Sequence, residues 1–285
     1  MELKLLHFIL RFSNAIKTIL RWIDDLRLSY MRYMENQNLL PILHLEQVSL
    51  PATLGSDLLL RNISFKIGQG EKVGIIGASG AGKTSLLKLL NQLVSHSEGE
   101  IYLENISLKQ LTAIELRRKI ILIPQEPKLL GMKVKYALEY PLKLQQLSNL
   151  EIQTRLDRWT NLLRIPSEWF EKTELQLSLG QRQLVTIARG LMMQPQIILL
   201  DEPTSALDLG LATHLLRVLN ELNQAQNLTI IMVNHQLDLI QGFCDRLIFL
   251  NQGILAADVA ATESNWQKLR HEILEIQHRQ SQDWS

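Results

Sequence analysis

The chain has 285 residues, a formal net charge of +1 at pH 7 and a single cysteine, Cys244. This near-neutral charge argues against a nucleic-acid partner, because binding a phosphate backbone requires a basic excess, and one cysteine excludes an intramolecular disulfide. No run of about 18 consecutive apolar residues occurs, so we expect no segment that spans a bilayer. The length suits one large α/β domain with appendages.

Residues 1–40 carry the pattern of a long amphipathic helix. Apolar side chains recur three and four residues apart, on one stripe: Leu5, Ile9, Phe12, Ile16, Ile19, Ile23, Leu26, Tyr30 and Tyr33. Three arrangements fit this stripe. Residues 1–35 could contact a membrane surface, the helix could pair with a membrane partner or another helix, or it could cover its own domain. The pattern leaves all three open.

Two β-strands are predicted next, over residues 42–50 and 58–67, joined by a turn at Gly55-Ser56-Asp57. A short β-branched strand, residues 72–76, is followed by Gly77-Ala78-Ser79-Gly80-Ala81-Gly82-Lys83-Thr84 and then by a strong helix former, residues 86–90. The glycine-rich segment fits the pattern G-x-x-x-x-G-K-[ST]. Its strand–loop–helix setting is the one that a phosphate-binding loop requires.

The residue types of this loop suit a triphosphate with a magnesium ion. Gly77, Gly80 and Gly82 keep side chains away, so that backbone N–H groups can surround phosphate oxygens, and the following helix adds its positive dipole end. Lys83 can bring its charge to the β- and γ-phosphates, and the Thr84 hydroxyl can ligate Mg²⁺. The other loop positions expected to bind nucleotide are Ser79, Ala81 and Ser85.

Further strands and a helical segment follow. Residues 100–103 and 120–123 are predicted strands, and the second ends just before Gln125, at the place where open α/β sheets bind ligands. From 126 to 177 no strand pattern occurs. Helices are predicted over 133–140, 148–164 and 167–173, interrupted by Pro141 and Pro166. This pattern indicates a helical subdomain inserted into the sheet.

Two acidic residues leave the next buried strand, residues 197–200. Adjacent carboxylates there are unfavourable unless a metal or a proton occupies them. With a phosphate loop upstream, Asp201 is interpreted as a Mg²⁺ ligand and Glu202 as the base for an attacking water. Residues 228–233 are expected to form the last buried strand, which ends before His235.

Helices flank these strands. Ser178 is a natural N-cap for a helix whose core face is Leu184, Ile187, Ala188 and Leu191. The turn Ser205–Asp208 leads into a helix over 210–223, and residues 259–285 are predicted to form a short C-terminal helix, bearing Trp266, Leu269, Ile273 and Leu274, with a polar tail.

In this order and spacing, the motifs resemble the ATPase subunit of ATP-binding-cassette (ABC) transporters over residues 42–258. Leu177-Ser178-Leu179-Gly180-Gln181 resembles the family signature, Gln125 its Q-loop, Asp201-Glu202 its Walker B pair, Ser205–Asp208 its D-loop and His235 its switch histidine. The resemblance implies an α/β P-loop NTPase fold. Such a fold has a mostly parallel core sheet, an antiparallel β subdomain and an inserted helical subdomain, here with an extra N-terminal arm.

The resemblance also implies an ATP- and Mg²⁺-dependent ATPase that works as a homodimer or pseudo-dimer. Ser178, Gly180, Gln181 and Asp208 would then act on the nucleotide held by the other copy. Gln125 would join Thr84 and Asp201 at the metal, and Gln125, Glu202 and His235 would be catalytic. Gln125 and the helical insert would contact an integral membrane permease, which implies a cytoplasmic location on the inner face of the cell membrane.

Two positions depart from the family pattern. The residue after the signature serine is usually glycine but is Leu179 here, and a leucine restricts φ. The aromatic side chain that usually stacks on adenine is missing: its position matches Leu54, and residues 45–64 contain no aromatic residue. We therefore expect weak discrimination between nucleotide bases.

Two other classes of protein share the phosphate loop. Non-transport cassette proteins that act on nucleic acid or ribosomes usually carry two cassettes, or a long coiled coil between the phosphate loop and the Walker B acids, and neither occurs here. A P-loop small-molecule kinase has no use for Ser178–Gln181. The transport ATPase remains the leading interpretation.

Overall fold

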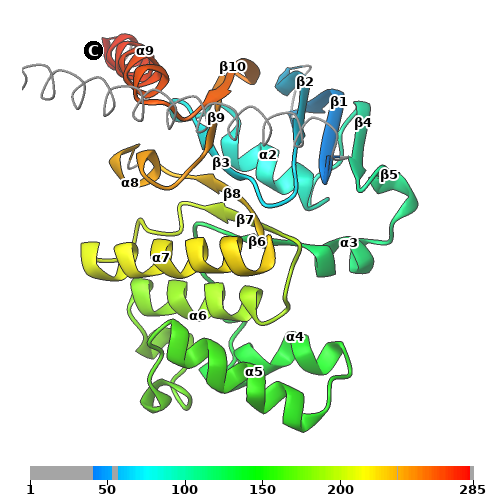
Figure 1. Cartoon of the computed structure of the whole chain (residues 1–285), viewed down its shortest axis with the longest axis vertical. Coiled ribbons are helices and arrows are strands. Elements are labelled where there is room, and N and C mark those ends of the chain that lie inside the picture. The colour runs from blue at the N-terminus through cyan, green and yellow to red at the C-terminus, as the bar shows by residue number, and fades with distance from the viewer. Residues whose placement is uncertain (1–40, 53–56, 236, 283–285) are drawn as a thin grey trace, which may run out of the picture. The chain divides into compact units, whose positions relative to one another are not determined.

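The computed structural model describes residues 41–52, 57–235 and 237–282. The predicted arm at residues 1–40, the position Leu54 and most of the predicted turn at residues 55–57 lie outside the described residues. The compact unit that begins at Ile42 holds two sheets with helices around them (Figure 1).

The first sheet has four strands and is entirely antiparallel. It consists of β1 (Leu43–Pro51), β2 (Leu58–Ile67), β4 (Glu98–Leu103) and β5 (Ile106–Ser107), in the order β2-β1-β4-β5. Strand β2 alternates buried and exposed side chains in its carboxyl-terminal half, residues 63–67, as expected of a strand with one face on a core. This sheet is the antiparallel β subdomain that the sequence predicts.

The second sheet has six strands and is mostly parallel. Its order is β10-β9-β3-β8-β7-β6, from β3 (Lys72–Ile76), β6 (Ile120–Ile123), β7 (Ile197–Asp201), β8 (Thr229–Val233), β9 (Arg246–Asn251) and β10 (Ile254–Ala260). Only β10 runs antiparallel, beside β9. The expectation that residues 228–233 form the last buried strand is wrong. Strand β9 follows it, buried along Leu247–Leu250 because it lies between β10 and β3.

The six-stranded sheet is covered on both faces. Along β7, Ile197 and Leu199 join the core shared with the antiparallel sheet, whereas Ile198 and Leu200 join the core shared with the helices. Burial of both faces explains why β7 and β8 are continuous apolar runs without alternation.

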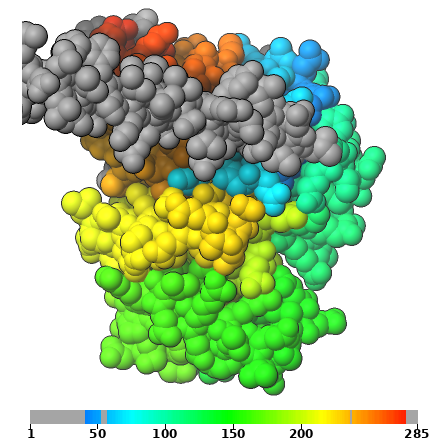
Figure 2. Space-filling model, in the orientation of Figure 1, coloured from blue at the N-terminus to red at the C-terminus, as the bar shows by residue number. Residues whose placement is uncertain are grey.

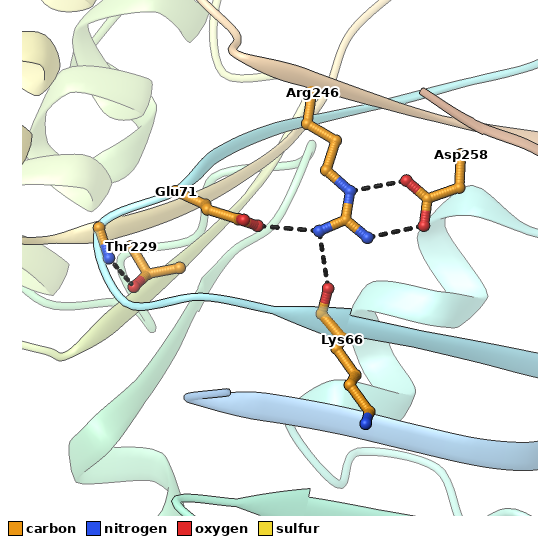
Figure 3. Close-up of polar contacts among 6 residues, drawn as sticks. Lys66, Glu71, Thr229, Arg246 and Asp258 are labelled. Atoms are coloured by element: carbon orange, nitrogen blue, oxygen red, sulfur yellow. Dashed lines mark hydrogen bonds and ion pairs between the residues drawn. The ribbon is translucent and has the colours of Figure 1, made fainter. Parts of the chain in front are cut away.

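Arg246 joins the two sheets through a set of polar contacts (Figure 3). Its guanidinium donates two hydrogen bonds to Asp258 of β10, both at 2.6 Å, and a third at 2.7 Å to the Lys66 carbonyl of β2. It also lies 3.0 Å from the Glu71 carboxylate. The Asp258 hydrogen bonds raise the pKa of this arginine. A bidentate pair of this kind fixes orientation, so β2 is held beside β9 and β10.

The helices are distributed around these sheets. They are α2 (Lys83–Leu90), α3 (Ala113–Lys119), α4 (Val134–Leu144), α5 (Asn149–Leu162), α6 (Leu179–Leu191), α7 (Leu209–Gln226), α8 (Leu237–Gln241) and α9 (Glu263–Gln282), with 3-10 turns η1 (Leu108–Gln110), η2 (Ser167–Trp169) and η3 (Glu174–Gln176). Helix α7 lies against the helical insert, coloured green (Figure 2), and His214 Nε2 lies 2.8 Å from the Leu162 carbonyl of α5. Among the described helices none has the length and apolarity to cross a membrane.

The helical insert differs from its prediction at both prolines. Pro141 does not interrupt a helix but lies inside α4, because Ala137, Leu138 and Leu142 are fully buried and their packing outweighs the lost hydrogen bond. Beyond Pro166, the helix predicted over residues 167–173 is only the 3-10 turn η2. Few apolar positions occur there to sustain a longer helix face.

The C-terminal helix α9 spans 20 residues, longer than the short helix expected. All four residues predicted on this helix lie on α9, where Trp266, Leu269 and Ile273 are buried in the helical core and Leu274 is exposed. The apolar face of α9 is therefore narrower than the sequence suggests.

Candidate nucleotide-binding site

The carboxyl ends of four neighbouring parallel strands bring the predicted site residues together. Across the sheet, Ile75 of β3 pairs with Val233 of β8, and Val233 pairs with Asp201 of β7. The loop after β3, the Asp201-Glu202 pair and His235 therefore leave the sheet at one level. Strand β6 adds Gln125 from the same edge. This edge is where open α/β sheets bind ligands.

The glycine loop between β3 and α2 is shaped by close backbone approaches. A Cβ at Gly77 would lie 2.2 Å from the Leu250 carbonyl oxygen. Gly82, the N-cap of α2, has φ +97°, and a Cβ there would lie 2.8 Å from a Leu60 methyl. Glycine has no Cβ, so it avoids both close contacts and adopts a positive φ without strain. The loop therefore stays open as a cradle of backbone groups at a helix N-terminus, which suits an anion.

Lys83, at the start of α2, points back into this loop. Its Nζ donates hydrogen bonds to the carbonyls of Gly77 at 2.8 Å and Ala78 at 2.7 Å. Burial lowers the pKa of Lys83, against the opposing charges of Glu202 and Asp201. A desolvated ammonium held over the cradle is a ready partner for a phosphate oxygen.

Asp201 and Thr84 form the part of the site that fits Mg²⁺. Thr84 Oγ1 donates to Asp201 Oδ1 at 3.2 Å, and the Asp201 residue is only 3% exposed. Burial raises the pKa of this carboxyl, with the Thr84 hydrogen bond opposing the shift. A hydroxyl and a buried carboxylate are hard oxygen ligands, and a divalent cation would compensate the buried charge. The residues present therefore fit the metal.

Glu202 and His235 form a pair beside the loop. Glu202 Oε1 lies 3.0 Å from His235 Nε2. A carboxylate can only accept, so the imidazole nitrogen donates in this pair. Glu202 has φ +50°, in the left-handed region, and its backbone N–H donates to the Val233 carbonyl at 2.9 Å. An unusual φ of this kind at a strand end is typical of functional positions.

These residues line one pocket of about 370 Å³. Its lining consists of Leu59, Ser79, Gly80, Ala81, Gly82, Lys83, Thr84, Ser85, Gln125, Glu202 and His235. Asp201 reaches the same site through Thr84. The structure thus brings together the predicted metal-binding and catalytic residues with the predicted loop, of which Gly77 alone lines a neighbouring hollow instead.

Four predicted residues, Ser178, Gly180, Gln181 and Asp208, do not line this pocket. Ser178 caps α6 instead, because its hydroxyl accepts from Gln181 N at 3.2 Å and its N–H donates to Gln181 Oε1 at 2.9 Å. Asp208 caps α7 through Leu211 N at 2.8 Å. Both helix N-termini are thus ordered by capping interactions.

Leu179 adopts ordinary helical backbone as the first residue of α6. Its φ is not among the positive values of the described chain, so a leucine fits here without strain. The expected restriction of φ therefore does not disturb the cap. Gly180 is the constrained position, since a Cβ there would lie 2.5 Å from the Ala206 carbonyl oxygen.

Leu59 is the pocket residue that the sequence interpretation missed. It lies on β2, is 42% exposed, and its carbonyl oxygen would lie 2.4 Å from a Cβ at Gly253. The signal that could have identified it is the alternation of β2, in which Leu59 is an apolar residue on an exposed position. Among the described residues that line this pocket, it is the large apolar side chain.

Taken together, the sheet order, the glycine cradle and the converging carboxylates define an α/β P-loop nucleotide-binding protein. Residues 60–205 match the family model described as ABC transporter. This match covers just over half of the chain, and the chain belongs to the ABC transporter family.

Curated relatives and solved structures agree with this assignment. The methionine import ATP-binding protein MetN of Francisella tularensis subsp. holarctica (strain OSU18) is 38% identical over 205 residues, which are 70% of this chain and 58% of that protein. MetN of Carboxydothermus hydrogenoformans is 35% identical over 206 residues, 71% of this chain and 61% of that protein. The chain thus spans less than two thirds of the length of these relatives.

Among solved structures, the dimeric ATP-binding cassette MJ0796, bound to ADP and Pi in a post-hydrolysis state, superposes with a TM-score of 0.71 at 29% identity and covers 77% of this chain and 99% of that one. The cbiO1 protein of Clostridium perfringens, part of the ABC transporter complex cbiONQ, gives 0.70 at 26% identity over 85% and 99%. Each similarity extends across nearly the whole of the neighbouring cassette.

Proposed function

We propose that the chain binds and hydrolyses ATP as the motor subunit of an ABC transporter and powers substrate movement through a separate membrane protein. The observation that carries this proposal is the convergence of Lys83, Thr84, Asp201, Glu202 and His235 on one pocket at one sheet edge. The MetN relatives are named as import proteins, which supports import over export.

In this proposal the loop amides and Lys83 bind the phosphates. Thr84, Asp201 and Gln125 would hold Mg²⁺, which neutralises charge on the transferred phosphoryl group. Glu202 accepts a proton from the attacking water. His235 lies 3.0 Å from Glu202 and lines the pocket, so it would orient that carboxylate and face the γ-phosphate. These groups lie at strand ends or at the start of α2, on regular elements of the fold, which supports the precision that phosphoryl transfer requires.

The signature residues support a dimeric catalyst. Ser178, Gly180, Gln181 and Asp208 lie outside their own pocket, and we infer that they contact the nucleotide of a second copy, or of a similar subunit. The capped N-terminus of α6 then offers N–H groups and its dipole to the γ-phosphate. ATP closes the two copies around itself, and hydrolysis releases them.

A groove beside the helical insert, about residues 126–177, supports docking of a membrane permease. It has a volume of about 190 Å³ and lies between β6, α4 and α6. Three apolar side chains on it, Leu130, Tyr140 and Leu144, are exposed to solvent. Exposed apolar grooves of this kind are typical of protein interfaces. Since Gln125 follows β6 directly, a permease seated there would sense the nucleotide site, and the chain would lie on the inner face of the membrane.

The experiment that tests the function compares two variants with the parent. Lys83→Ala is expected to lose nucleotide binding, because it removes the charge that faces the phosphates. Glu202→Gln is expected to keep ATP binding and to lower turnover by about 10²–10⁴, so that light scattering detects an ATP-dependent dimer. Full turnover in Glu202→Gln, or a monomer with bound ATP, would contradict the proposal.

A further inference from the structure

Glu174 lies four residues before Ser178 and contacts two segments that are far apart in the sequence. One carboxylate oxygen, Oε2, accepts a hydrogen bond of 2.9 Å from the backbone N–H of Leu129, 45 residues away. The other oxygen, Oε1, lies 3.4 Å from Nη1 of Arg182, in the first turn of α6. This side chain therefore bridges the segment that follows Gln125 and the helix that carries the signature.

The backbone of Leu129 depends on this contact. Leu129 is fully buried, and a buried N–H without a partner costs about as much free energy as a lost hydrogen bond. The residue lies between β6 and α4, so no ladder or helix supplies an acceptor and a side chain has to do so. A carboxylate suits this task, because hydrogen bonds to an ionised group are roughly twice as strong as neutral ones.

The same peptide group is held at its other end by α6. Arg189 Nη2 donates to the Lys128 carbonyl at 3.1 Å, so both polar atoms of the peptide between Lys128 and Leu129 are bound by side chains. Burial lowers the pKa of Arg189, and the charge of Glu174 opposes that shift. The buried Nε of Arg182 has no hydrogen-bond partner among the described residues. Glu174 is thus the carboxylate that compensates two guanidinium groups of α6.

The backbone between Glu174 and the signature is ordered by two caps in succession. Glu174 is the first residue of η3, where the Thr173 N–H donates to Gln176 Oε1 at 2.8 Å. Leu177 is buried, and Ser178 then caps α6. Capping interactions of this kind fix the direction in which the chain enters a helix. We therefore expect a displacement of Glu174 to displace the N-terminus of α6.

We propose that Glu174 is a positioning residue for the active site of the dimer. By holding the peptide group of Leu129 against α6, it keeps the N-terminus of that helix where Ser178 meets the nucleotide of the second copy. The inference rests on the proposed dimeric function. Glu174 does not line the nucleotide pocket of its own chain. Its effect should therefore appear in the assembled dimer and not in nucleotide binding by one copy.

Three variants in the Glu202→Gln background test the proposal by light scattering with Mg²⁺ and ATP. Glu174→Ala removes both contacts and should weaken ATP-dependent dimerisation at least about tenfold. Glu174→Gln keeps an oxygen acceptor without the charge, so it should weaken dimerisation by about threefold, half the effect in free energy. The matched control is Glu171→Ala, which removes the same charge from an exposed ion pair with Lys133 and should dimerise like the parent.

Two further measurements separate positioning from a general loss of structure. Titration of each monomer with fluorescent nucleotide should give the dissociation constant of the parent. In chains that retain Glu202, kcat should fall most in Glu174→Ala, less in Glu174→Gln and not at all in Glu171→Ala. Amide hydrogen exchange at Leu129 should accelerate in Glu174→Ala and stay slow in Glu171→Ala, which tests the contact itself.

The outcomes separate this inference from the proposed function. If the Glu202→Gln parent dimerises with ATP and both Glu174 variants dimerise equally well, the inference is overturned alone. If Glu174→Ala does not fold, Glu174→Gln decides the question by the same comparison. Loss of nucleotide binding by the Glu174→Gln monomer would assign the residue to the fold of its own pocket and would also overturn the inference. A monomeric parent overturns the dimeric function and this inference with it.

Discussion

Gly180→Ala should separate the two proposed halves of the active site. An added Cβ would lie 2.5 Å from the Ala206 carbonyl oxygen and 3.4 Å from a Leu207 methyl. The nearer contact is backbone, so the loop or α6 must move. Overpacking of this kind costs about 1–3 kcal/mol. Each 1 kcal/mol lowers the melting temperature of a domain of this size by about 2–4 °C, which predicts a loss of roughly 2–12 °C.

The functional effect of Gly180→Ala should fall on the second copy. Displacing the N-terminus of α6 from the Ser205–Asp208 loop moves both segments proposed to contact the partner's nucleotide. Turnover and ATP-dependent dimerisation should therefore fall, whereas nucleotide binding to the monomer should persist, because Gly180 does not line that pocket. The assays are thermal melting, fluorescent-nucleotide titration and phosphate release.

Leu179→Gly is the matched control for this variant. It restores the glycine that the family usually has, and Leu179 is exposed with ordinary helical backbone. Its expected cost is at most about 1 kcal/mol of helix propensity. If Gly180→Ala melts like the parent, the steric reasoning fails. If a folded Gly180→Ala protein loses nucleotide binding as a monomer, the assignment of Gly180 to the other copy fails.

Four further predictions concern the parent protein and three single substitutions. Leu59→Trp should place a stacking surface in the pocket. Stacking contributes roughly 1–3 kcal/mol per base, so the ATP dissociation constant should fall by about five- to 150-fold. A titration in which ATP binds Leu59→Trp no better than it binds the parent would refute this. The parent, without stacking, should use GTP nearly as well as ATP at subsaturating concentration, and a GTPase rate far below the ATPase rate would argue against that. Burial raises the Asp201 pKa, so the ionised carboxylate destabilises the metal-free fold as pH rises through the folded pKa. Asp201→Asn should therefore lose less stability than the parent as pH rises through that range, and it should lose stabilisation by Mg²⁺ with ATP. An identical pH dependence of the melting temperature in the two proteins would contradict this. Leu144→Asp, on the exposed apolar groove, should abolish co-purification with a membrane partner while leaving ATP binding intact, and Leu150→Asp serves as its control.

The motifs that line the pocket could be placed from the sequence because each follows a buried strand. Continuous apolar runs before Asp201 and His235 are typical of a parallel sheet covered on both faces, and such a sheet brings its carboxyl ends to one edge. Lys83, Thr84, Gln125 and the two strand ends were therefore expected to meet, and they do. No long-range information was needed for this part of the site.

The elements that sequence interpretation missed depend on contacts between distant segments. The apolar run of strand β9 does not by itself distinguish a buried strand from a segment of a buried helix. The pairing of β9 with β3 and β10 identifies it as a strand. Leu59 reaches the pocket because Gly82 and Gly253 admit the backbone of β2. Pro141 stays helical because its neighbours are buried. In each case tertiary packing outweighed the local preference.

A short chain of contacts joins Glu202, the proposed catalytic base, to the surface proposed for the other copy. The Glu202 carbonyl accepts from Ser205 Oγ at 3.0 Å and from Ser205 N at 3.3 Å, which fixes the loop that follows β7. One residue later, the Ala206 carbonyl meets Gly180 so closely that no side chain fits between them. We therefore expect a shift of the Glu202 backbone to move the N-termini of α6 and α7. Because packed segments move as units, hydrolysis in one pocket and release of the opposite nucleotide should be coupled through this loop rather than through solvent.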